Sequence, residues 1–280
     1  MSESTIKSEG PWALRLVPPF PAIANRVVGL VNSAEPDLHQ ISEAINLDPV
    51  FATEILRAAN SPLYSAAREV TTVKVAVPRL GLDRVKAVAA LIAVRAMLKP
   101  ALRMETLRRC WIHSLVTAIL AEEGARACGS RADTAYTAGL LHNLGSLGLM
   151  AAHPDEYRRM LDVSSEFNFD LLQAERDIFE IDHCTAGARL ARKWGFPEEI
   201  AAAIATHHDE PKAGSGSISA LVQVSWRLAD TLGYRAYVTD RIWTYDELVV
   251  TVPGATRTWL GGGIDDTKRE ISSRLDSFAL

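Results

Sequence analysis

The sequence of 280 residues has few features of secreted or membrane-spanning proteins. It contains only three cysteines, Cys110, Cys128 and Cys184, which are odd in number and widely spaced. This pattern favours a reduced compartment over a disulfide framework. No uninterrupted apolar run approaches the roughly 18 residues of a membrane-spanning helix, and the polar N-terminus lacks the apolar stretch of a signal peptide. We therefore expect a cytoplasmic protein that does not bind membranes.

An excess of charge of one sign is also lacking. The chain has 30 Lys and Arg residues against 34 Asp and Glu residues, a formal net charge of −4. There is no overall basic field to attract nucleic acid. One stretch is locally basic and could bind a phosphate-rich ligand, but we interpret it as a solvated helix surface and expect no nucleic-acid partner. Its basic residues are Arg79, Arg84, Lys86, Arg95, Lys99, Arg103, Arg108 and Arg109.

Alternation with period two is almost absent, whereas apolar residues at helical spacing run through most of the chain. Asp37 and the pair Asp48 and Pro49 are start signals for two short helices, because Asp caps a helix N-terminus and Pro is tolerated in its first turn. Further helices are predicted over residues 73–98, where Gly81 breaks the segment into two helices and Asp83 is a possible cap, and over 104–127, 132–150, 155–181, 197–208 and 218–232. After Gly233 the helical pattern weakens until a last amphipathic helix from about residue 265. The sequence predicts an all-α protein.

Seven histidines occur, and five lie on or beside the predicted helices. Imidazole is a common ligand for transition metals, so histidines from different helices can form a metal site. A single histidine on a partly apolar helix is more often a hydrogen-bonded core residue. Spacing does not show whether the side chains meet, so both interpretations stay open. The five are His113, His142, His183, His207 and His208.

Residues 138–148, with the sequence AGLLHNLGSLG, resemble the His-Asp centre of the HD phosphohydrolase superfamily. In that superfamily, adjacent His and Asp side chains bind a metal that lowers the pKa of a water for attack on a phosphoester. Here the second position is Asn143, a neutral amide that binds divalent cations poorly and cannot act as a general base. Ser146 follows Gly145 where superfamily enzymes often carry lysine. We interpret Asn143 as the vestige of the His-Asp pair.

Two further positions resemble the superfamily pattern. His113, in the sequence WIHS, matches its first histidine, and Asp230, in an Ala-Asp pair, matches its last metal-binding aspartate. Trp226 would be a bulky neighbour for such a site, and Asp230 is equally well explained as a surface or capping residue. Asp182 and Asp209 are weaker carboxylate candidates. The resemblance thus implies a metal set of His113, His142, His183, His207, His208 and Asp230.

The N-terminal half resembles one branch of this superfamily, the HDOD (HD-related output domain) family. The likeness rests on residues 16–24 (LVPPFPAIA), 45–50 (INLDPV), 55–64 (ILRAANSPLY) and 73–81, and continues downstream to about residue 233. It implies a multi-helix bundle of HD-like type with an N-terminal group of short packed helices. The predicted organisation is a tail over residues 1–15, an N-terminal helical subdomain over 16–100, a degenerate HD-like subdomain over 101–233 and an extension over 234–280.

Members of this family are regarded as bacterial regulatory modules, so the resemblance implies a signal-transduction role. We expect binding of a protein partner or a nucleotide messenger, with no catalytic residues. The alternative is a metal-dependent phosphohydrolase or phosphodiesterase that uses the five histidines. A third hypothesis is a zinc or iron site without turnover. We expect no cofactor, with a divalent or transition metal as the alternative that the histidines leave open.

Overall fold

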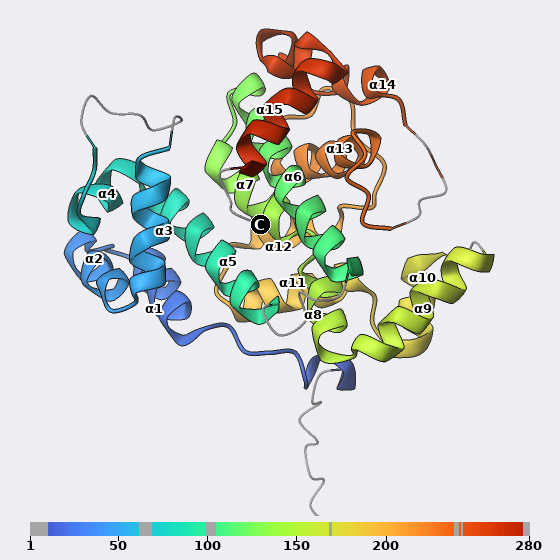
Figure 1. The fold of residues 1–280 in the computed structure, drawn as a ribbon, viewed down its shortest axis with the longest axis horizontal. Coiled ribbons are helices and arrows are strands. Elements are labelled where there is room, and N and C mark those ends of the chain that lie inside the picture. Colours follow the sequence, from blue (N-terminus) through green and yellow to red (C-terminus); the bar gives the residue numbers. More distant parts are fainter. Residues whose placement is uncertain are drawn as a thin grey trace, which may run out of the picture.

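The computed structural model describes residues 11–61, 69–98, 105–167, 170–237, 241 and 243–276. All regular structure within these residues is helical, and they contain no β-strand. Two groups of helices lie side by side and are joined by one long helix (Figure 1). The predicted all-α fold class is confirmed.

The first group consists of four short helices, two of which begin at the predicted caps. The Asp37 side chain accepts hydrogen bonds from the first turn of α2, and the Asp48 side chain does the same for α3, in which Pro49 is the first residue. The apolar faces pack around fully buried Ile41 and Phe51. The group comprises α1 (Ala22–Val31), α2 (Leu38–Asn46), α3 (Pro49–Ala59) and α4 (Val73–Leu80).

The chain between α3 and α4 is held by one asparagine. The Asn60 side chain donates to the carbonyl of Val70 and accepts from its amide, each over 2.8 Å. This residue opens the NSPLY part of the family motif, and it joins the end of α3 to Val70. Pro62, Leu63 and Tyr64 of the same motif lie outside the described residues.

Helix α5 (Leu82–Leu98) joins the two groups. It packs against α1, α3 and α4 on one side and against α7 and α8 on the other. Most of its residues are buried, because neighbours surround it on both sides. The predicted subdomain boundary near residue 100 stays a prediction.

The second group surrounds the long, largely buried helix α6. The continuous helix predicted over residues 132–150 is interrupted at His142 and Asn143, which separate α7 from α8. Helix α7 packs closely on α6, since a Cβ at Gly139 would lie 2.8 Å from the Cα of Ala118. The group comprises α6 (Glu105–Cys128), α7 (Ala132–Leu141), α8 (Leu144–Ala152), α11 (His183–Lys193), α12 (Glu198–Ala205) and α13 (Ile218–Thr231).

The C-terminal segment covers α6 and α13. It contains α14 (Tyr245–Val249), two short 3-10 turns, η3 (Ala255–Arg257) and η4 (Trp259–Gly262), and α15 (Ile264–Asp276). The buried Glu122 carboxylate of α6 pairs with Arg84, Arg126 and Arg274, at 3.1, 2.8 and 3.2 Å. These ion pairs connect α5, α6 and α15.

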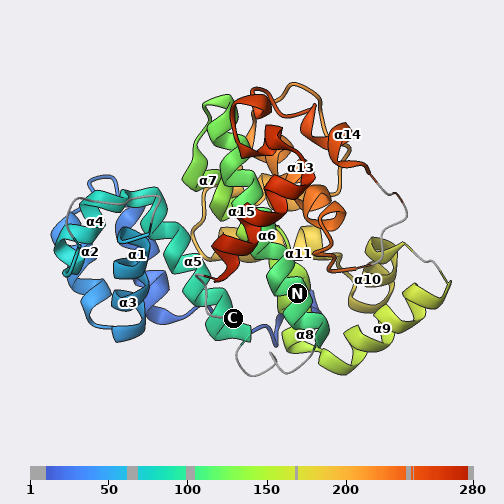
Figure 2. The same ribbon diagram turned by 45° about the horizontal axis from the view of Figure 1, so that its top comes forward.

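Two helices, α9 (Pro154–Phe167) and α10 (Leu171–Phe179), extend from the bundle in both ribbon views (Figures 1 and 2). Their base is fixed by the N-terminal turn η1 (Trp12–Leu14). There the His153 ring donates through Nε2 to the carbonyl of Ala13 over 2.9 Å, and its ring lies 4.9 Å from that of Trp12.

No described helix is both long enough and apolar enough to cross a membrane. In the locally basic stretch, Arg84, Lys86, Arg95 and Arg108 each pair with a carboxylate, which favours an ordinary helix surface. Lys99 and Arg103 lie outside the described residues.

Candidate metal centre and pocket

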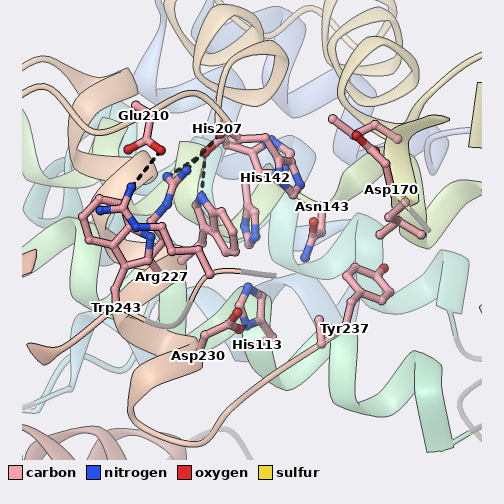
Figure 3. A pocket seen from close by; sticks show the side chains of 16 residues that line it. His113, His142, Asn143, Asp170, His207, Glu210, Arg227, Asp230, Tyr237 and Trp243 are labelled. Carbon is pink, nitrogen blue, oxygen red and sulfur yellow. Dashed lines mark hydrogen bonds and ion pairs between the residues drawn. The ribbon is translucent and has the colours of Figure 1, made fainter. Parts of the chain in front are cut away.

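Five of the seven histidines meet inside the second group of helices. His113 lies in the middle of α6, His142 follows α7, His183 begins α11, and His207 and His208 follow α12. The structure therefore brings together all five histidines selected from the sequence, and Figure 3 shows three of them beside one pocket. The distances between ring centroids are 5.2 Å (His113 to His142), 5.0 Å (His142 to His207), 5.2 Å (His207 to His183), 5.0 Å (His183 to His208) and 4.4 Å (His207 to His208).

A close crossing of α8 and α11 positions His142 and His183. Gly145, in the first turn of α8, packs against the carbonyl of His183, and a Cβ at position 145 would overlap that oxygen. On the opposing helix, a Cβ at Gly187 would lie 2.9 Å from the backbone nitrogen of Gly145. The glycine after His142 and Asn143 therefore permits the helix contact that brings the two histidines together.

Four of the rings have a fixed tautomer. Each Nδ1 lies 2.7 Å from an oxygen that can only accept a hydrogen bond, so each Nδ1 carries a proton and donates. In the neutral ring the remaining nitrogen, Nε2, keeps its lone pair for a metal, an arrangement common among metal-binding histidines. The acceptors are Tyr234 O for His113, Gly139 O for His142, Ile204 O for His207 and the Glu175 carboxylate for His183.

Burial keeps most of the cluster neutral. It lowers the pKa of His113 to about 4 and that of His208 to about 2. Burial likewise lowers the pKa of His142 and of His207 well below the usual value. Metal ions bind neutral imidazole, so these four residues are ready to act as ligands at neutral pH.

His183 differs because it is paired with a fully buried carboxylate, Glu175 of α10. Glu175 Oε2 accepts from both the backbone nitrogen and Nδ1 of His183, each over 2.7 Å, and Oε1 accepts from the Tyr157 hydroxyl. Burial alone would lower the pKa of His183, but the Glu175 charge outweighs it and raises the pKa well above the usual value. Glu175 thus orients His183 and increases its basicity.

Sequence reasoning missed Glu175. A usable signal exists, because Glu175 lies four residues after Leu171 and four before Phe179, at a position of α10 that helical spacing assigns to the apolar face. An acidic residue at such a position needs a buried partner.

Three Nε2 atoms converge at a separation that suits a metal ion. His183 Nε2 lies 3.1 Å from Nε2 of His208 and 3.3 Å from Nε2 of His207. A tetrahedral zinc ion with Zn–N distances of about 2.0–2.1 Å separates its ligands by about 3.3–3.4 Å. Lone pairs this close repel unless a proton or a cation lies between them. The donor set and its spacing therefore fit a transition metal.

Cys184 also lies within 4.8 Å of the ligand atoms of His183, His207 and His208. Its Sγ approaches Nδ1 of His207 at 3.8 Å. That nitrogen donates to Ile204, so the thiol faces the side of the ring that is already bonded. The three histidines rather than Cys184 define the centre.

Asp230 lies at the other end of the cluster. Its Oδ1 is 3.4 Å from Nδ1 of His113, and Figure 3 shows the two side chains together. Among the described residues, no carboxylate belongs to the close group of metal-binding atoms around His183. Asp182 caps α11 and pairs with Arg176, and Asp209 is exposed, so neither supplies a carboxylate to this centre.

Asn143 and Ser146 occupy the positions that the superfamily pattern gives to Asp and Lys. Asn143 lines the pocket beside His142, and Ser146 is fully buried in α8. Both side chains are neutral, so these two positions provide neither a carboxylate ligand nor a cation.

The cluster opens into a pocket of about 310 Å³. Its inner wall carries four of the histidines and Asn143, and its outer wall comes from the start of α10 and from residues after α12 (Figure 3). Burial lowers the pKa of Arg227 in this wall to about 10. The outer-wall residues are Asp170, Leu171, Leu172, Glu210, Trp226, Arg227, Asp230, Ala236, Tyr237, Arg241 and Trp243.

Helix α13 holds the turn that carries His207 and His208. Trp226 Nε1 donates to the carbonyl of His207 over 2.6 Å, and Arg227 donates to that of His208 over 2.9 Å. Gln223 donates to the preceding carbonyl, Thr206, over 2.9 Å. Trp226, expected from the sequence to be a bulky neighbour of a metal site, lies with its ring centroid 4.9 Å from that of His208 and also holds the turn through its indole nitrogen.

Comparisons with known proteins agree with this fold. A crystal structure of an HDOD domain protein with unknown function from Geobacter sulfurreducens has 29% sequence identity and a TM-score of 0.67, covering 93% of this chain and 89% of that one. A candidate signal transduction protein from Marinobacter aquaeolei VT8 has 25% identity and a TM-score of 0.66, covering 94% of this chain and 60% of that one.

A third relative is an uncharacterized protein from Treponema pallidum (strain Nichols), 25% identical over 199 residues. The alignment includes 70% of this chain but only 38% of the relative. Finally, residues 17–210 match the family model described as HDOD domain. Because this match spans more than half of the sequence, the chain belongs to the HDOD family, as its motifs predict.

Proposed function

We propose that this chain is a regulatory signal-transduction module that binds a transition metal ion and does not hydrolyse phosphoesters. The observation that carries the proposal is the convergence of Nε2 atoms from His183, His207 and His208, with His142 adjacent to them. The Nδ1 atoms of His142, His183 and His207 are held by acceptors, so that their Nε2 atoms face the cluster. A signalling role agrees with the family and with the relative from Marinobacter aquaeolei.

In this proposal His183, His207 and His208 hold the ion, and His142 is the next available ligand. A bound ion supplies positive charge and ligand bonds at the junction of α7, α11 and α12. Glu175 keeps His183 oriented, while Trp226 and Arg227 keep the His207–His208 turn in place. The site thereby links the relative positions of three helix ends to metal occupancy.

The absence of catalysis is inferred from the residues beside His142. Asn143 and Ser146 offer no general base, and a neutral amide does not compensate the charge of a metal. We infer that the output is instead the binding of a partner protein. A nucleotide messenger in the 310 Å³ pocket is the alternative ligand, since the pocket wall contains Trp226, Arg227 and Trp243.

One observation favours a second candidate, a metal-dependent phosphohydrolase. Asp230 lies on the pocket wall beside His113, at 3.4 Å. A carboxylate there could bind a second ion together with His113 and His142, or act as a base. This hypothesis requires turnover that depends on Asp230.

The test combines elemental analysis with a phosphodiesterase assay on protein whose affinity tag has been removed. We expect about one equivalent of transition metal and no hydrolysis of bis(p-nitrophenyl) phosphate. His208→Ala should lose the metal, whereas His39→Ala, a matched change at an exposed histidine of α2, should retain it. Replacing Asn143 with Asp tests whether the missing carboxylate restores turnover.

Two outcomes contradict the proposal. Hydrolysis by the natural protein that disappears in Asp230→Asn would establish the phosphohydrolase. A metal content that is equally low in the natural protein and in His208→Ala, even after incubation with Zn²⁺ or Fe²⁺, would leave the histidines as core residues.

A further inference from the structure

The two helices that extend from the bundle, α9 and α10, enclose an apolar groove, which shares the lining residue Asp170 with the pocket at the histidine cluster. Its volume is about 650 Å³, and both ribbon views show the pair leaving the body of the molecule (Figures 1 and 2). The described lining residues are Glu156, Arg159, Met160 and Val163 from α9, and Asp170, Gln173, Ala174, Asp177 and Ile178 from α10 and its cap.

The floor of the groove is aliphatic and partly exposed. Val163 is 47% and Ile178 is 42% exposed, and Met160 and Ala174 lie in the same groove. Aliphatic side chains that share one exposed groove gain free energy when a partner removes them from water. Contiguous apolar surface with a polar rim is typical of protein interaction sites.

The rim of the groove is acidic. Glu156, Asp170 and Asp177 are exposed along it, against a single basic residue, Arg159. Within the described part of the chain, none of the three carboxylates forms an ion pair with Lys or Arg. Asp177 accepts from the Gln173 amide and Asp170 caps α10, so these contacts are with uncharged groups and place no basic side chain on the rim.

We propose that this groove binds an amphipathic helix of a partner protein, with one apolar face and Lys or Arg along its flanks. The apolar face would cover Val163 and Ile178, and the basic flanks would lie against the acidic rim. Helix α10 has nine residues and α9 has fourteen. They are about 13 and 21 Å long, enough to accommodate two to four turns of a partner helix.

The groove is connected to the histidine cluster through helix α10. Helix α10 contributes Ile178 and Ala174 to the groove and also carries buried Glu175, which binds His183. A partner in the groove therefore contacts the helix that orients His183. This link rests on the proposed metal function, whereas docking itself depends only on the groove.

The probe is a fluorescein-labelled peptide of 14 residues with Leu at helical spacing and Lys elsewhere. Its binding to the full chain is followed by fluorescence anisotropy, with and without Zn²⁺. A second peptide with Glu in place of Lys tests whether binding requires positive charges opposite the acidic rim. We expect the Lys peptide to bind, because its positive charges face the acidic rim. The Glu peptide should bind at least about tenfold more weakly, because its negative charges face the same acidic rim.

Variants locate the site. Val163→Asn and Ile178→Asn should each weaken binding of the Lys peptide by roughly tenfold, because each removes buried aliphatic area from the contact. Val75→Asn is the matched control, since Val75 is 54% exposed on α4. It should bind like the natural protein. Circular dichroism melting confirms that each variant is folded.

The proposal is overturned if neither peptide binds, if both bind equally, or if Val163→Asn and Ile178→Asn bind as tightly as Val75→Asn. It is also overturned if the chain self-associates in sedimentation and Ile178→Asn abolishes that association, because a second copy would then occupy the groove. Peptide binding by protein that holds no metal would separate the docking surface from the metal function.

Discussion

The two groups of helices bury different chemistry. Through residue 98, Ser42 is the single buried polar side chain in the described part of the chain, and the core there is aliphatic with Phe51 at its centre. From α6 onward the interior also holds ionisable side chains. They are His113, Glu122, Glu123, His142, His153, Glu175, His183, His207, Arg227 and Asp230.

This difference separates a scaffold from a site. An aliphatic core needs volume and shape, and it tolerates conservative exchange. Buried ionisable groups are destabilising unless each finds a partner. Every cluster histidine except His208 donates its Nδ1 proton to a protein acceptor 2.7 Å away.

Removal of Glu175 should have the largest effect. Glu175→Ala leaves His183 and the Tyr157 hydroxyl buried without their acceptor, and we expect a loss of about 3–5 kcal/mol in the free energy of unfolding. Urea denaturation measures it, with Glu43→Ala, an exposed glutamate of α2, as the matched change expected to cost under about 0.5 kcal/mol. Equal effects at the two positions would contradict the buried network described here.

Acidification should destabilise the second group selectively. The folded pKa of His113 is about 4 because of burial, below the unfolded value of 6.5. Between those values the unfolded state binds a proton that the folded state does not. Stability present above pH 6.5 is therefore lost as the pH falls toward 4, by up to about 1.4 kcal/mol per pH unit for each such histidine.

His142 and His207 have pKa values shifted in the same direction. The raised pKa of His183 has the opposite effect on stability. Its contribution to the free energy of unfolding is complete below pH 6.5 and is lost as the pH rises through the pKa of His183 in the folded protein. Urea unfolding of metal-free protein at several pH values from 7.5 to 4.5 measures the slope. His113→Asn should reduce the slope of the free energy of unfolding against pH, and His39→Ala should not. Identical slopes in both variants would contradict the lowered pKa of His113.

Two glycines, one in each group of helices, allow the comparison to be tested at the backbone. Gly145→Ala places a Cβ against the His183 carbonyl, so we expect a loss of about 1–3 kcal/mol and weaker metal binding. Gly29→Ala in α1 meets no atom within 4 Å and should stabilise the helix by about 0.5–1 kcal/mol. Thermal melting and metal titration read out both changes. A neutral Gly145→Ala would mean that α8 and α11 lie further apart.

The smallest effect is expected in the aliphatic core. Ile41→Val removes one buried methylene group and should cost about 0.5–1.5 kcal/mol. Metal affinity should stay unchanged, because Ile41 belongs to the first group of helices. A change in metal affinity larger than about twofold would show that the two groups are coupled through α5.

Helix boundaries were predictable where a local signal decides them. Asp37 and Asp48 cap the helices that they were expected to cap, because the cap contacts involve residues two or three positions away. The break at His142 and Asn143 was missed. It lies within an apolar run, and the His142 ring bonds back to Gly139 while α11 packs on Gly145, contacts that depend partly on a distant helix.

The histidines of the candidate site were predictable from the sequence, but the residues that hold them in place were not. The five histidines stand out by residue type and order. Glu175 does not, since its partner His183 is on another helix, and the carbonyl contacts of Trp226 and Arg227 also join residues far apart in the sequence. Asp230 lies in the pocket, yet beside His113 rather than within the close group around His183.

The sequence by itself determined the helical fold, the caps of the short helices, the family and the residue types available to a metal. These properties depend on local spacing and on motifs that can be recognised in order. Only the tertiary structure decided that the histidines converge, which ring nitrogen of four of them is bonded to the protein, and that an acidic-rimmed groove forms between α9 and α10. Those features arise from contacts between helices, and helical periodicity alone contains no information on which helices meet.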